Sequence, residues 1–171
     1  LKVTLTDPQP NDDSENDMVW SPSVITNLIE YAELLIGGQP IERITGEYIY
    51  MYQQLNNTND DIEQTLYFLN GHGNYLSYAG EYTYFLDLPF YFYRNPSLAI
   101  PTCALTKQLV EVRIKTRPLS QLVRNIGAAD AEGISDVTAS INKFSLDTEF
   151  VYVTPEERGY IMSRPLDYVI T

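Results

Sequence analysis

Cysteine and histidine are almost absent from this sequence: Cys103 and His72 are the only residues of their kinds among 171. A single cysteine cannot form an internal disulfide, which excludes a small disulfide-linked secreted scaffold and favours a reducing compartment. Cys103 lies in an apolar run, and we expect a buried, inert thiol. With one histidine and no Gly-x-Ser-x-Gly sequence, catalysis by a Ser-His-Asp or Cys-His assembly is disfavoured. We therefore predict that the chain is not an enzyme.

Basic residues and long apolar runs are also scarce. Lys and Arg number 11 against 23 Asp and Glu, and the formal net charge is −12. No basic cluster stands apart from the acids, so direct binding to DNA or RNA is disfavoured. No apolar run approaches the roughly 18 residues needed to cross a bilayer. With 44% hydrophobic residues, the composition favours one globular domain with a substantial core.

Alternation of apolar and polar residues predicts several half-exposed strands. Residues 1–6 alternate from the first position, so we expect the chain to be a piece of a longer polypeptide. Ile29–Ile36 is predicted as a strand that ends at the Gly37-Gly38 turn, and residues 105–116 form the clearest half-exposed strand. Residues 144–153 and the final residues 166–171 are also predicted as strands.

Three-and-four spacing of apolar residues predicts helices between the strands. One predicted helix follows Gly38, and a second, short one follows Asn59 or Asp60. A third begins at Thr154, where Pro155 and Glu157 complete a capping box, and Arg164-Pro165 ends it. The first two apolar stripes are expected to pack in the core; they comprise Ile41, Ile44, Tyr48, Met51, Tyr52 and Leu55, and then Ile62, Leu66 and Leu69.

Residues 82–93 are unusually aromatic and are predicted as a strand with two faces. One face is a core face of Leu, Phe and Tyr; the other contains Phe85, Tyr91 and Tyr93 among polar residues. The second face is covered either by another layer of the same domain or by another subunit. Pro89 cannot donate to a sheet ladder, so the strand restarts, bulges or forms an edge there.

The loops contain polar groups for which chemical and structural interpretations both exist. The acidic residues 7–18 resemble a calcium loop, although they lack the glycine and glutamate spacing of an EF-hand, and a solvated loop is favoured. His72, in the Gly-rich residues 70–80, is either a metal ligand or general base, or an exposed loop residue, which is favoured. Residues 125–140 are predicted as a long loop with one weak strand. Asn56 begins an Asn-Asn-Thr triplet that matches the N-glycosylation pattern.

About six to eight strands, joined by irregular connections and a few short helices, favour one fold class. The prediction is a mainly β protein: an antiparallel jelly roll, that is, a Greek-key β-sandwich, with short inserted helices.

Three segments, in this order and spacing, resemble one protein family. Residues 31–55, "YAELLIGGQPIERITGEYIYMYQQL", resemble its strand, Ile-Gly-Gly-Gln turn and helix. Residues 88–114, "LPFYFYRNPSLAIPTCALTKQLVEVRI", are similar to its aromatic strand, Asn-Pro-x-Leu-Ala-x-Pro turn and next strand. Residues 146–170 resemble its strand, Glu-Glu-Arg helix and following strand. The family is the major capsid proteins of the nucleocytoplasmic large DNA viruses.

The resemblance implies a structural virion protein without a cofactor. Family members have two jelly rolls, form trimers with a pseudo-hexagonal outline and tile an icosahedral shell. Residues 1–171 would then form most of the first jelly roll, without an opening strand or two and without the second roll. The implied partners are two further copies, neighbouring capsomers and minor capsid proteins. The shell would be assembled in the host cytoplasm, near an internal membrane and without direct contact to nucleic acid.

Tyr91, Tyr93 and Arg94 are the residues that we expect to form a layer or subunit contact. A rival hypothesis from another class is a carbohydrate-binding jelly roll that uses exposed tyrosines as stacking platforms. An enzyme is the third hypothesis, with His72 as the residue to mutate if any turnover were found.

Overall fold

The computed structural model describes residues 1–10, 18–56, 69–71, 80–125, 137–165 and 167, and within these ranges the chain is mainly antiparallel β-structure. Two three-stranded sheets have the orders β10-β1-β6 and β5-β4-β7, and two short pairs join β2 to β9 and β3 to β8. The strands are β1 (Lys2–Thr6), β2 (Gln9–Pro10), β3 (Met18–Trp20), β4 (Ile29–Ile36), β5 (Gln39–Thr45), β6 (Glu81–Phe85), β7 (Val110–Thr116), β8 (Val123–Asn125), β9 (Val137–Thr138) and β10 (Ile141–Ser145).

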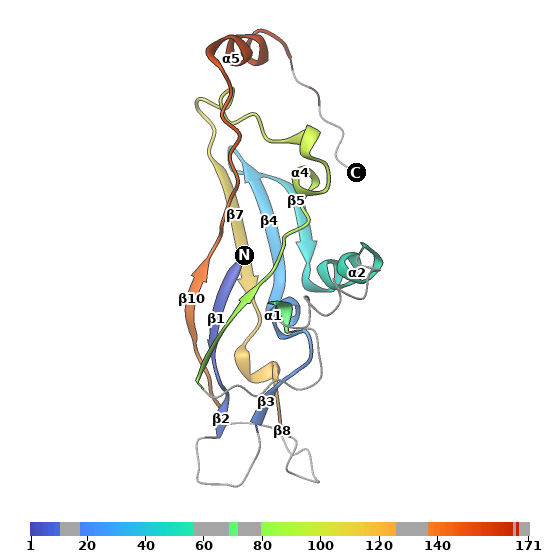
Figure 1. Ribbon diagram of the computed structural model, residues 1–171, viewed down its shortest axis with the longest axis vertical. Helices are drawn as coiled ribbons and strands as arrows, with labels where there is room; N and C mark the ends of the chain where they lie inside the picture. The colour runs from blue at the N-terminus through green and yellow to red at the C-terminus, as the bar shows by residue number, and fades with distance from the viewer. Residues whose placement is uncertain (11–17, 57–68, 72–79, 126–136, 166, 168–171) are drawn as a thin grey trace.

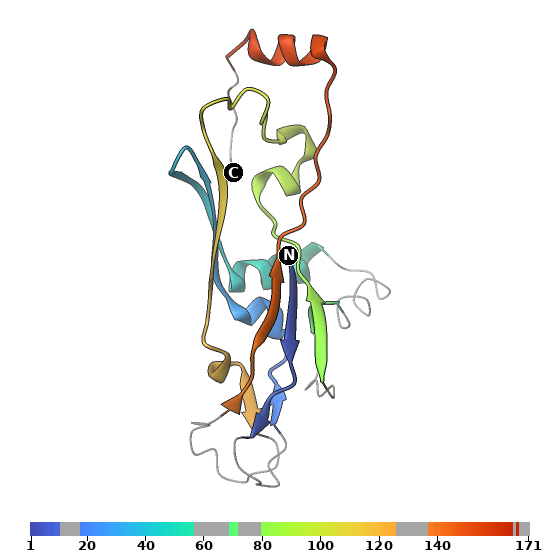
Figure 2. The same ribbon diagram turned by 90° about the vertical axis from the view of Figure 1, so that its left-hand side faces the viewer.

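The two three-stranded sheets lie face to face as the layers of a sandwich (Figures 1 and 2). Side chains from both sheets and from the connecting segments fill the space between them. The core is a single cluster whose most deeply buried members include Val3, Leu5, Val24, Ile25, Leu28, Ile29, Ala32, Leu34, Ile49, Tyr84 and Leu86. Burial of this apolar surface is the main force that holds the layers together.

β1 lies at the centre of its sheet, between strands that are far away in the sequence. It pairs antiparallel with β6 and with β10, and Val3 lies opposite both Tyr84 and Phe144. Val3 and Leu5 are almost fully buried, as the alternation of residues 1–6 predicts. A register shift between Thr4 and Leu5 interrupts the pairing with β10. Such long-range antiparallel pairing is typical of Greek-key sandwiches.

The connection after β4 is a tight hairpin, which corrects the helix predicted to follow Gly38. Gly37 and Gly38 have φ values of 60° and 80°, and β5 returns antiparallel along β4. Two consecutive positive φ values suit the two-residue turns that match strand twist. The helix α2 (Gly46–Asn56) begins only after β5.

The apolar stripe predicted from Ile41 to Leu55 is only partly buried, so the prediction that the whole stripe packs in the core is wrong. Ile44, which lies on β5, is buried, whereas Met51 and Leu55 on α2 are 54% and 78% exposed. α2 lies to one side of the sandwich, so only part of its surface meets the core (Figure 1).

Gly46 is the point at which α2 meets the body of the domain. The short helix α1 (Val24–Leu28) leads into β4, and a Cβ atom built on Gly46 would lie 2.2 Å from the Thr26 carbonyl oxygen and 2.3 Å from that of Ile29. No side chain fits between these backbone atoms. Glycine at this position therefore allows α2 to start against α1 and β4.

The aromatic segment is a strand only up to Phe85, which corrects the prediction for residues 82–93. Beyond β6 the chain is irregular and then forms the helical turn α4 (Tyr91–Arg94) and the 3-10 turn η1 (Pro96–Leu98). The predicted core face is nevertheless buried, because Leu86, Leu88 and Phe90 are at most 8% exposed. The predicted alternation of burial holds up to Leu88, but Pro89 and Tyr91, which were predicted on the other face, are buried as well.

β7 confirms the strand predicted within residues 105–116, and it pairs with β4 over most of its length. A 3-10 turn, η2 (Leu119–Gln121), then leads to β8. Cys103 is partly exposed, so the prediction of a buried thiol is wrong.

At one end of the sandwich, the chain leaves the sheet and crosses to a terminal helix (Figure 1). The strand predicted for 144–153 ends at Ser145, and residues 146–153 continue without strand pairing. We call residues 146–153 the arm. The helix α5 (Pro155–Met162) has the predicted capping box: Thr154 Oγ1 accepts from the Glu157 amide, and Glu157 Oε2 accepts from the Thr154 amide at 2.8 Å.

Several predictions concern residues outside the described ranges: His72, the second helix around Ile62 and Leu66, most of the acidic segment 7–18, most of the loop 125–140, and nearly all of 166–171. In the part of the chain that is described, no helix is both long and apolar enough to cross a membrane.

Candidate assembly surfaces

A cluster of tyrosines joins α2 to α4 on the outside of the sandwich. The rings of Tyr48 and Tyr52 are 6.2 Å apart, and Arg94 Nη1 donates to the Tyr48 hydroxyl at 3.0 Å. Tyr93, one residue before Arg94, lies close enough to Tyr52 to interact with it electrostatically. We call these four residues the tyrosine cluster. Tyrosine and arginine are the residue types that protein interfaces favour.

Glu42 on β5 fixes the position of the turn that contains the cluster. Glu42 Oε1 accepts from Arg94 Nη2 at 2.7 Å, and Glu42 Oε2 accepts from the Tyr91 amide at 2.7 Å. The Glu42 and Arg94 side chains are only 13% and 23% exposed. A charge-assisted pair in this partly desolvated position constrains α4 more firmly than a surface pair would.

Tyr93 is the most exposed of the three residues that the sequence predicts for a contact. It is 48% exposed, and its hydroxyl donates to Asp87 Oδ2 at 2.9 Å. Partial burial, together with this bond to a carboxylate, raises the pKa of Tyr93 to about 12. The hydroxyl therefore stays neutral to a higher pH than that of an exposed tyrosine, and its bond to Asp87 restrains the ring.

The other two predicted residues mainly make contacts within the chain. Tyr91 is only 5% exposed and belongs to the core, with its ring edge-on to that of Phe92. Arg94 is paired with Glu42 as described above. Asn56, the predicted glycosylation residue, is exposed at the end of α2, where its Nδ2 donates to the Tyr52 carbonyl oxygen at 2.8 Å.

α2 adds apolar side chains next to the tyrosine cluster. Tyr50, Met51 and Leu55 are 39%, 54% and 78% exposed. An apolar surface of this kind on one helix, beside an aromatic cluster, is typical of surfaces that another protein covers.

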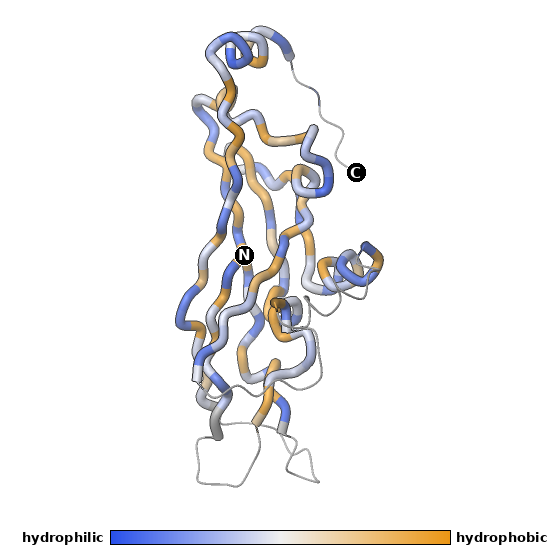
Figure 3. The backbone as a smooth tube through the Cα atoms, in the orientation of Figure 1, coloured by the Kyte–Doolittle hydropathy of each residue, from blue (hydrophilic) through white to orange (hydrophobic). Residues whose placement is uncertain are grey.

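The arm is the most apolar exposed segment in the described part of the chain. Phe150, Val151 and Tyr152 are 63%, 80% and 95% exposed, although the same residue types are buried in the strands below. Figure 3 shows hydrophobic stretches in this crossing segment as well as in the sandwich. Its sequence is that of a strand, but none of the described segments pairs with it.

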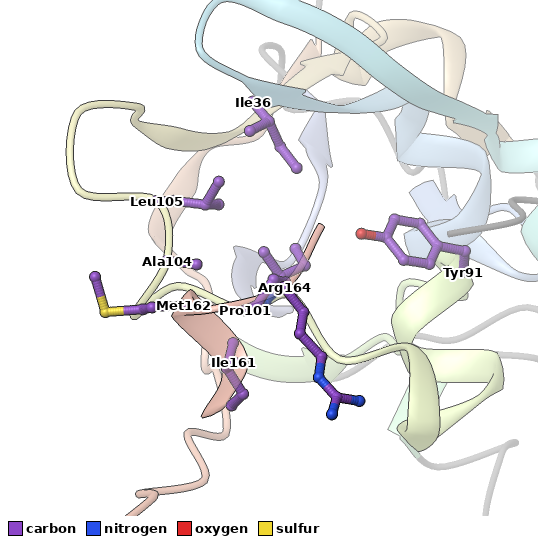
Figure 4. A pocket seen from close by; sticks show the side chains of 9 residues that line it. Ile36, Tyr91, Pro101, Ala104, Leu105, Ile161, Met162 and Arg164 are labelled. Atoms are coloured by element: carbon purple, nitrogen blue, oxygen red, sulfur yellow. The ribbon is translucent and has the colours of Figure 1, made fainter. Parts of the chain in front are cut away.

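A pocket of about 330 Å³ lies between α5 and the end of the sandwich. Figure 4 shows the side chains around it: Ile36 and Tyr91 come from the body, Ile161 and Met162 come from α5, and Arg164 lies two residues after the end of α5. Ile100, Pro101, Ala104 and Leu105 complete the lining. The lining is mainly apolar, so this space suits an apolar side chain better than a polar substrate.

The outer face of the β5-β4-β7 sheet is charged. Tyr31 on β4 carries the Arg43 guanidinium 3.8 Å from its ring centroid, and Lys115 Nζ lies 5.9 Å away on the other neighbouring strand. Lys115 also donates to Glu30 at 2.9 Å. Such a face is suited to water, in contrast to the arm and to α2. Among the described residues, no group of three or more potential ligands could hold a metal ion.

Two of the three residues predicted for a contact, Tyr93 and Arg94, belong to the tyrosine cluster. The sequence prediction did not include the arm or the pocket. Residues 150–153, "FVYV", are apolar at every position, so both faces of an extended segment are apolar there. A two-sided strand of this kind needs cover on both faces, and this pattern was the signal for the arm. The pocket has no local signal, because its lining comes from separate segments.

A two-layered antiparallel domain that exposes tyrosine, phenylalanine and valine on its outside fits the class of structural proteins that associate into larger assemblies. The chain belongs to the family described as "Major capsid protein N-terminus", whose model matches residues 1–154. The predicted membership of the capsid proteins of nucleocytoplasmic large DNA viruses is thereby confirmed, and the family is structural rather than enzymatic.

Viral capsid proteins are similar to most of the chain. Capsid protein 1 of Acanthamoeba polyphaga mimivirus is 26% identical over 187 residues, which cover 99% of this chain and 31% of the relative. The major capsid protein of Phaeocystis pouchetii virus is 24% identical over 84% of this chain and 33% of its own length. The chain thus spans about a third of the length of these relatives.

Solved capsid structures have the same fold. A quasi-atomic model of the PBCV-1 virus capsid matches with a TM-score of 0.66 at 20% identity, covering 99% of this chain and 39% of that one. A crystal structure of PBCV-1 VP54, fitted into a reconstruction of the virophage Sputnik, matches with a TM-score of 0.65. This likeness confirms the predicted jelly roll, mainly β with short helices.

Proposed function

We propose that this chain is part of a major capsid protein that associates into trimers with a pseudo-hexagonal outline, and that these trimers tile an icosahedral virion shell. The observation that carries the proposal is the half-exposed Tyr93 of the tyrosine cluster together with the adjoining exposed apolar side chains of α2. In an isolated chain this surface is in contact with water, and association with another copy would remove it from water.

The proposed domain organisation is a first jelly roll followed by a second one in a longer polypeptide. The length of the relatives, about three times that of this chain, supports this organisation. In that arrangement, residues 1–171 form most of the first jelly roll, and the whole protein uses both rolls to build a capsomer.

The proposed setting is the virion, with assembly in the host cytoplasm and with neighbouring capsomers and minor capsid proteins as further partners. The formal net charge of −12 supports a coat that does not bind the genome directly, because phosphates would repel it. A shell lined by an internal membrane is compatible with this charge.

Tyr93 is the proposed subunit contact. Its ring is half exposed, and the bond to Asp87 limits the conformational entropy that it would lose on binding. Arg94 supports the contact through Tyr48, and Tyr91 anchors the turn in the core. These three residues then act as one unit in which Tyr93 faces the partner.

The test is the oligomeric state of the full-length protein, measured by light scattering at micromolar concentration. The unaltered protein is expected to be a trimer. Tyr93→Asp places a carboxylate beside Asp87 and removes the ring, and it should weaken trimerisation at least 10-fold. Tyr93→Phe keeps the ring and removes only the hydroxyl, so trimers should remain.

A monomeric unaltered protein at that concentration would contradict the proposed function. If the Tyr93→Asp variant forms trimers of normal stability, Tyr93 is not part of the interface, but the proposed self-assembly is not contradicted. Circular dichroism of the two variants serves as the control for folding, because a misfolded variant also loses assembly.

A further inference from the structure

The pocket between α5 and the end of the sandwich, which we call the α5 pocket, is open and has apolar walls. Its volume of about 330 Å³ lies at the lower end of the range of small-molecule sites. A space of this size suits one or two side chains of a protein partner. Apart from Arg164, every residue that lines it is apolar or aromatic, and none is acidic (Figure 4).

Arg164 places a positive charge at the α5 pocket. Its guanidinium lies 4.3 Å from the centroid of the Tyr160 ring, and its Nη1 donates to the Tyr160 hydroxyl at 2.6 Å. None of the ion pairs between described residues includes Arg164. A cation that is oriented but not neutralised favours a partner that brings carbonyl oxygens or a partial negative charge.

The second half of α2 has the complementary chemistry. Residues 50–56, "YMYQQLN", include no charged residue, and the last turn of the helix has no basic residue. Met51 and Leu55 are four positions apart, so they lie on one face of α2, and they are 54% and 78% exposed. The last carbonyl groups of a helix carry a partial negative charge that a cation stabilises. This end of α2 therefore offers two apolar side chains beside a site for a cation.

The charge of the chain favours contact between these two surfaces. With a formal net charge of −12, two copies repel each other unless their contact regions avoid acidic side chains. The lining of the α5 pocket and residues 50–56 are both free of Asp and Glu. Contact between them buries apolar surface without bringing carboxylates together.

The two surfaces lie on different parts of the molecule, so a contact between them joins two copies. α2 lies beside the sandwich, whereas α5 lies beyond one end of it (Figure 1). Contact between unlike surfaces is heterologous, and its repetition closes a ring when the rotation between copies permits. Contact between two α2 surfaces would instead be isologous and would give a dimer. A trimer therefore requires a different surface opposite α2, and the α5 pocket meets this requirement.

We propose that the α5 pocket of one copy binds the end of α2 of the next copy, with Leu55 in the pocket and Arg164 facing the last carbonyl groups of α2. This inference rests on the proposed function, because it names the surface that α2 contacts when copies associate. The tyrosine cluster adjoins α2 and then lies at the edge of the same interface.

The test is disulfide crosslinking of the full-length protein, in which Cys103 is first replaced by Ser. Leu55→Cys is combined with Met162→Cys or, as the matched control, with Tyr160→Cys; Leu55→Cys alone gives the baseline. Met162 and Tyr160 lie on the same helix and are 51% and 58% exposed, but only Met162 lines the pocket. A disulfide requires Cβ atoms about 3.5–4.5 Å apart, so we expect about 10-fold more crosslinked trimer with Met162→Cys on a non-reducing gel.

A second variant blocks the pocket without changing either thiol. Ala104→Phe places a ring in space that is already open, so the fold should be retained, and an unchanged urea midpoint checks this. Crosslinking between positions 55 and 162 should fall about 10-fold, because the ring occupies the place of Leu55. Unchanged crosslinking in this variant would contradict the proposal.

Equal crosslinking with Met162→Cys and Tyr160→Cys would also overturn the proposal. Light scattering of the unaltered protein separates this result from the proposed function. Trimers without a disulfide between positions 55 and 162 contradict only the docking of α2. A crosslinked product from a protein that does not form trimers contradicts only the trimeric capsomer, and a monomer without crosslinks contradicts both.

Discussion

The sandwich and the arm have similar apolar sequences but opposite surroundings. Val3 and Leu34 on facing sheets are at most 1% exposed, whereas Val151 and Tyr152 in the arm are 80% and 95% exposed. A strand is buried only where another layer exists to cover it, and local apolarity does not reveal whether that layer is present. The arm is therefore core-like sequence that none of the described segments covers.

The largest effect is expected when a glycine in the body of the domain is compared with one in α5, the helix that follows the arm. Gly46→Ala would place a Cβ against two backbone carbonyl oxygens, and neither can move without shifting α1 or β4. We expect a loss of about 4 kcal/mol or more in the free energy of unfolding, measured by urea denaturation.

The matched control is Gly159→Ala in α5, where nothing lies within 4 Å of the added Cβ. Alanine there should stabilise the helical form of α5 by about 1 kcal/mol at most. The urea midpoint of the sandwich should stay unchanged. A mild effect at Gly46 would mean that α1 and α2 do not pack as closely as described.

A second contrast compares the deletion of apolar side chains. Leu34→Ala leaves a cavity between the sheets, and we expect it to cost about 3 kcal/mol. Val151→Ala in the chain 1–171 removes a side chain that is already exposed, and its effect should stay within about 0.5 kcal/mol. Comparable losses for both variants in thermal or urea unfolding would show that the arm is already packed within this chain.

A third contrast concerns ion pairs. Glu42 accepts from two donors, Arg94 and the Tyr91 amide, and glutamine offers only one acceptor atom for them. Glu42→Gln should therefore cost about 2 kcal/mol, because a partly buried donor loses its partner. Glu111→Gln breaks an exposed contact of 3.6 Å with Arg113 and should cost less than about 0.5 kcal/mol. Equal effects in urea denaturation would contradict the buried role of Glu42.

The smallest effect is expected from the ionisation of Tyr93. Burial and the bond to Asp87 raise its pKa to about 12, above the value near 10 of an exposed tyrosine. The neutral form is favoured in the folded state, so this stabilisation is present below about pH 10 and is lost as the pH rises toward 12. An ultraviolet titration should show a late-ionising component that is one tyrosine smaller in Tyr93→Phe; an unchanged late component would contradict the assignment.

The sequence predicts the elements in which local signals and tertiary pairing agree. β4 and β7 have clear apolar runs or alternation, and the cap of α5 is fixed by Thr154 and Glu157 alone. Residues 39–45 show the opposite case. Ile41 and Ile44 have helical spacing, but the positive φ values of Gly37 and Gly38 turn the chain back onto β4, and pairing determines the structure.

The candidate surfaces were predicted less completely than the fold. Tyr93 was identified from aromatic alternation, although the residues around it form a helical turn and Tyr91 points into the core. Glu42, which fixes that turn, lies 52 residues before Arg94, and no local pattern connects the two. The arm is exposed because no described segment packs against it, and the pattern of apolar residues along the sequence does not indicate whether such a neighbour is present.

The position of β1 also has a consequence for biosynthesis. Its two neighbours in the sheet end at Phe85 and Ser145, so β1 cannot acquire both until the ribosome has made residues up to Ser145. At about 5–20 residues per second, a nascent chain spends roughly 7 to 28 seconds with this strand incompletely paired. During that interval, β1 is an apolar strand with unpaired backbone groups, which is the kind of segment that pairs with other chains.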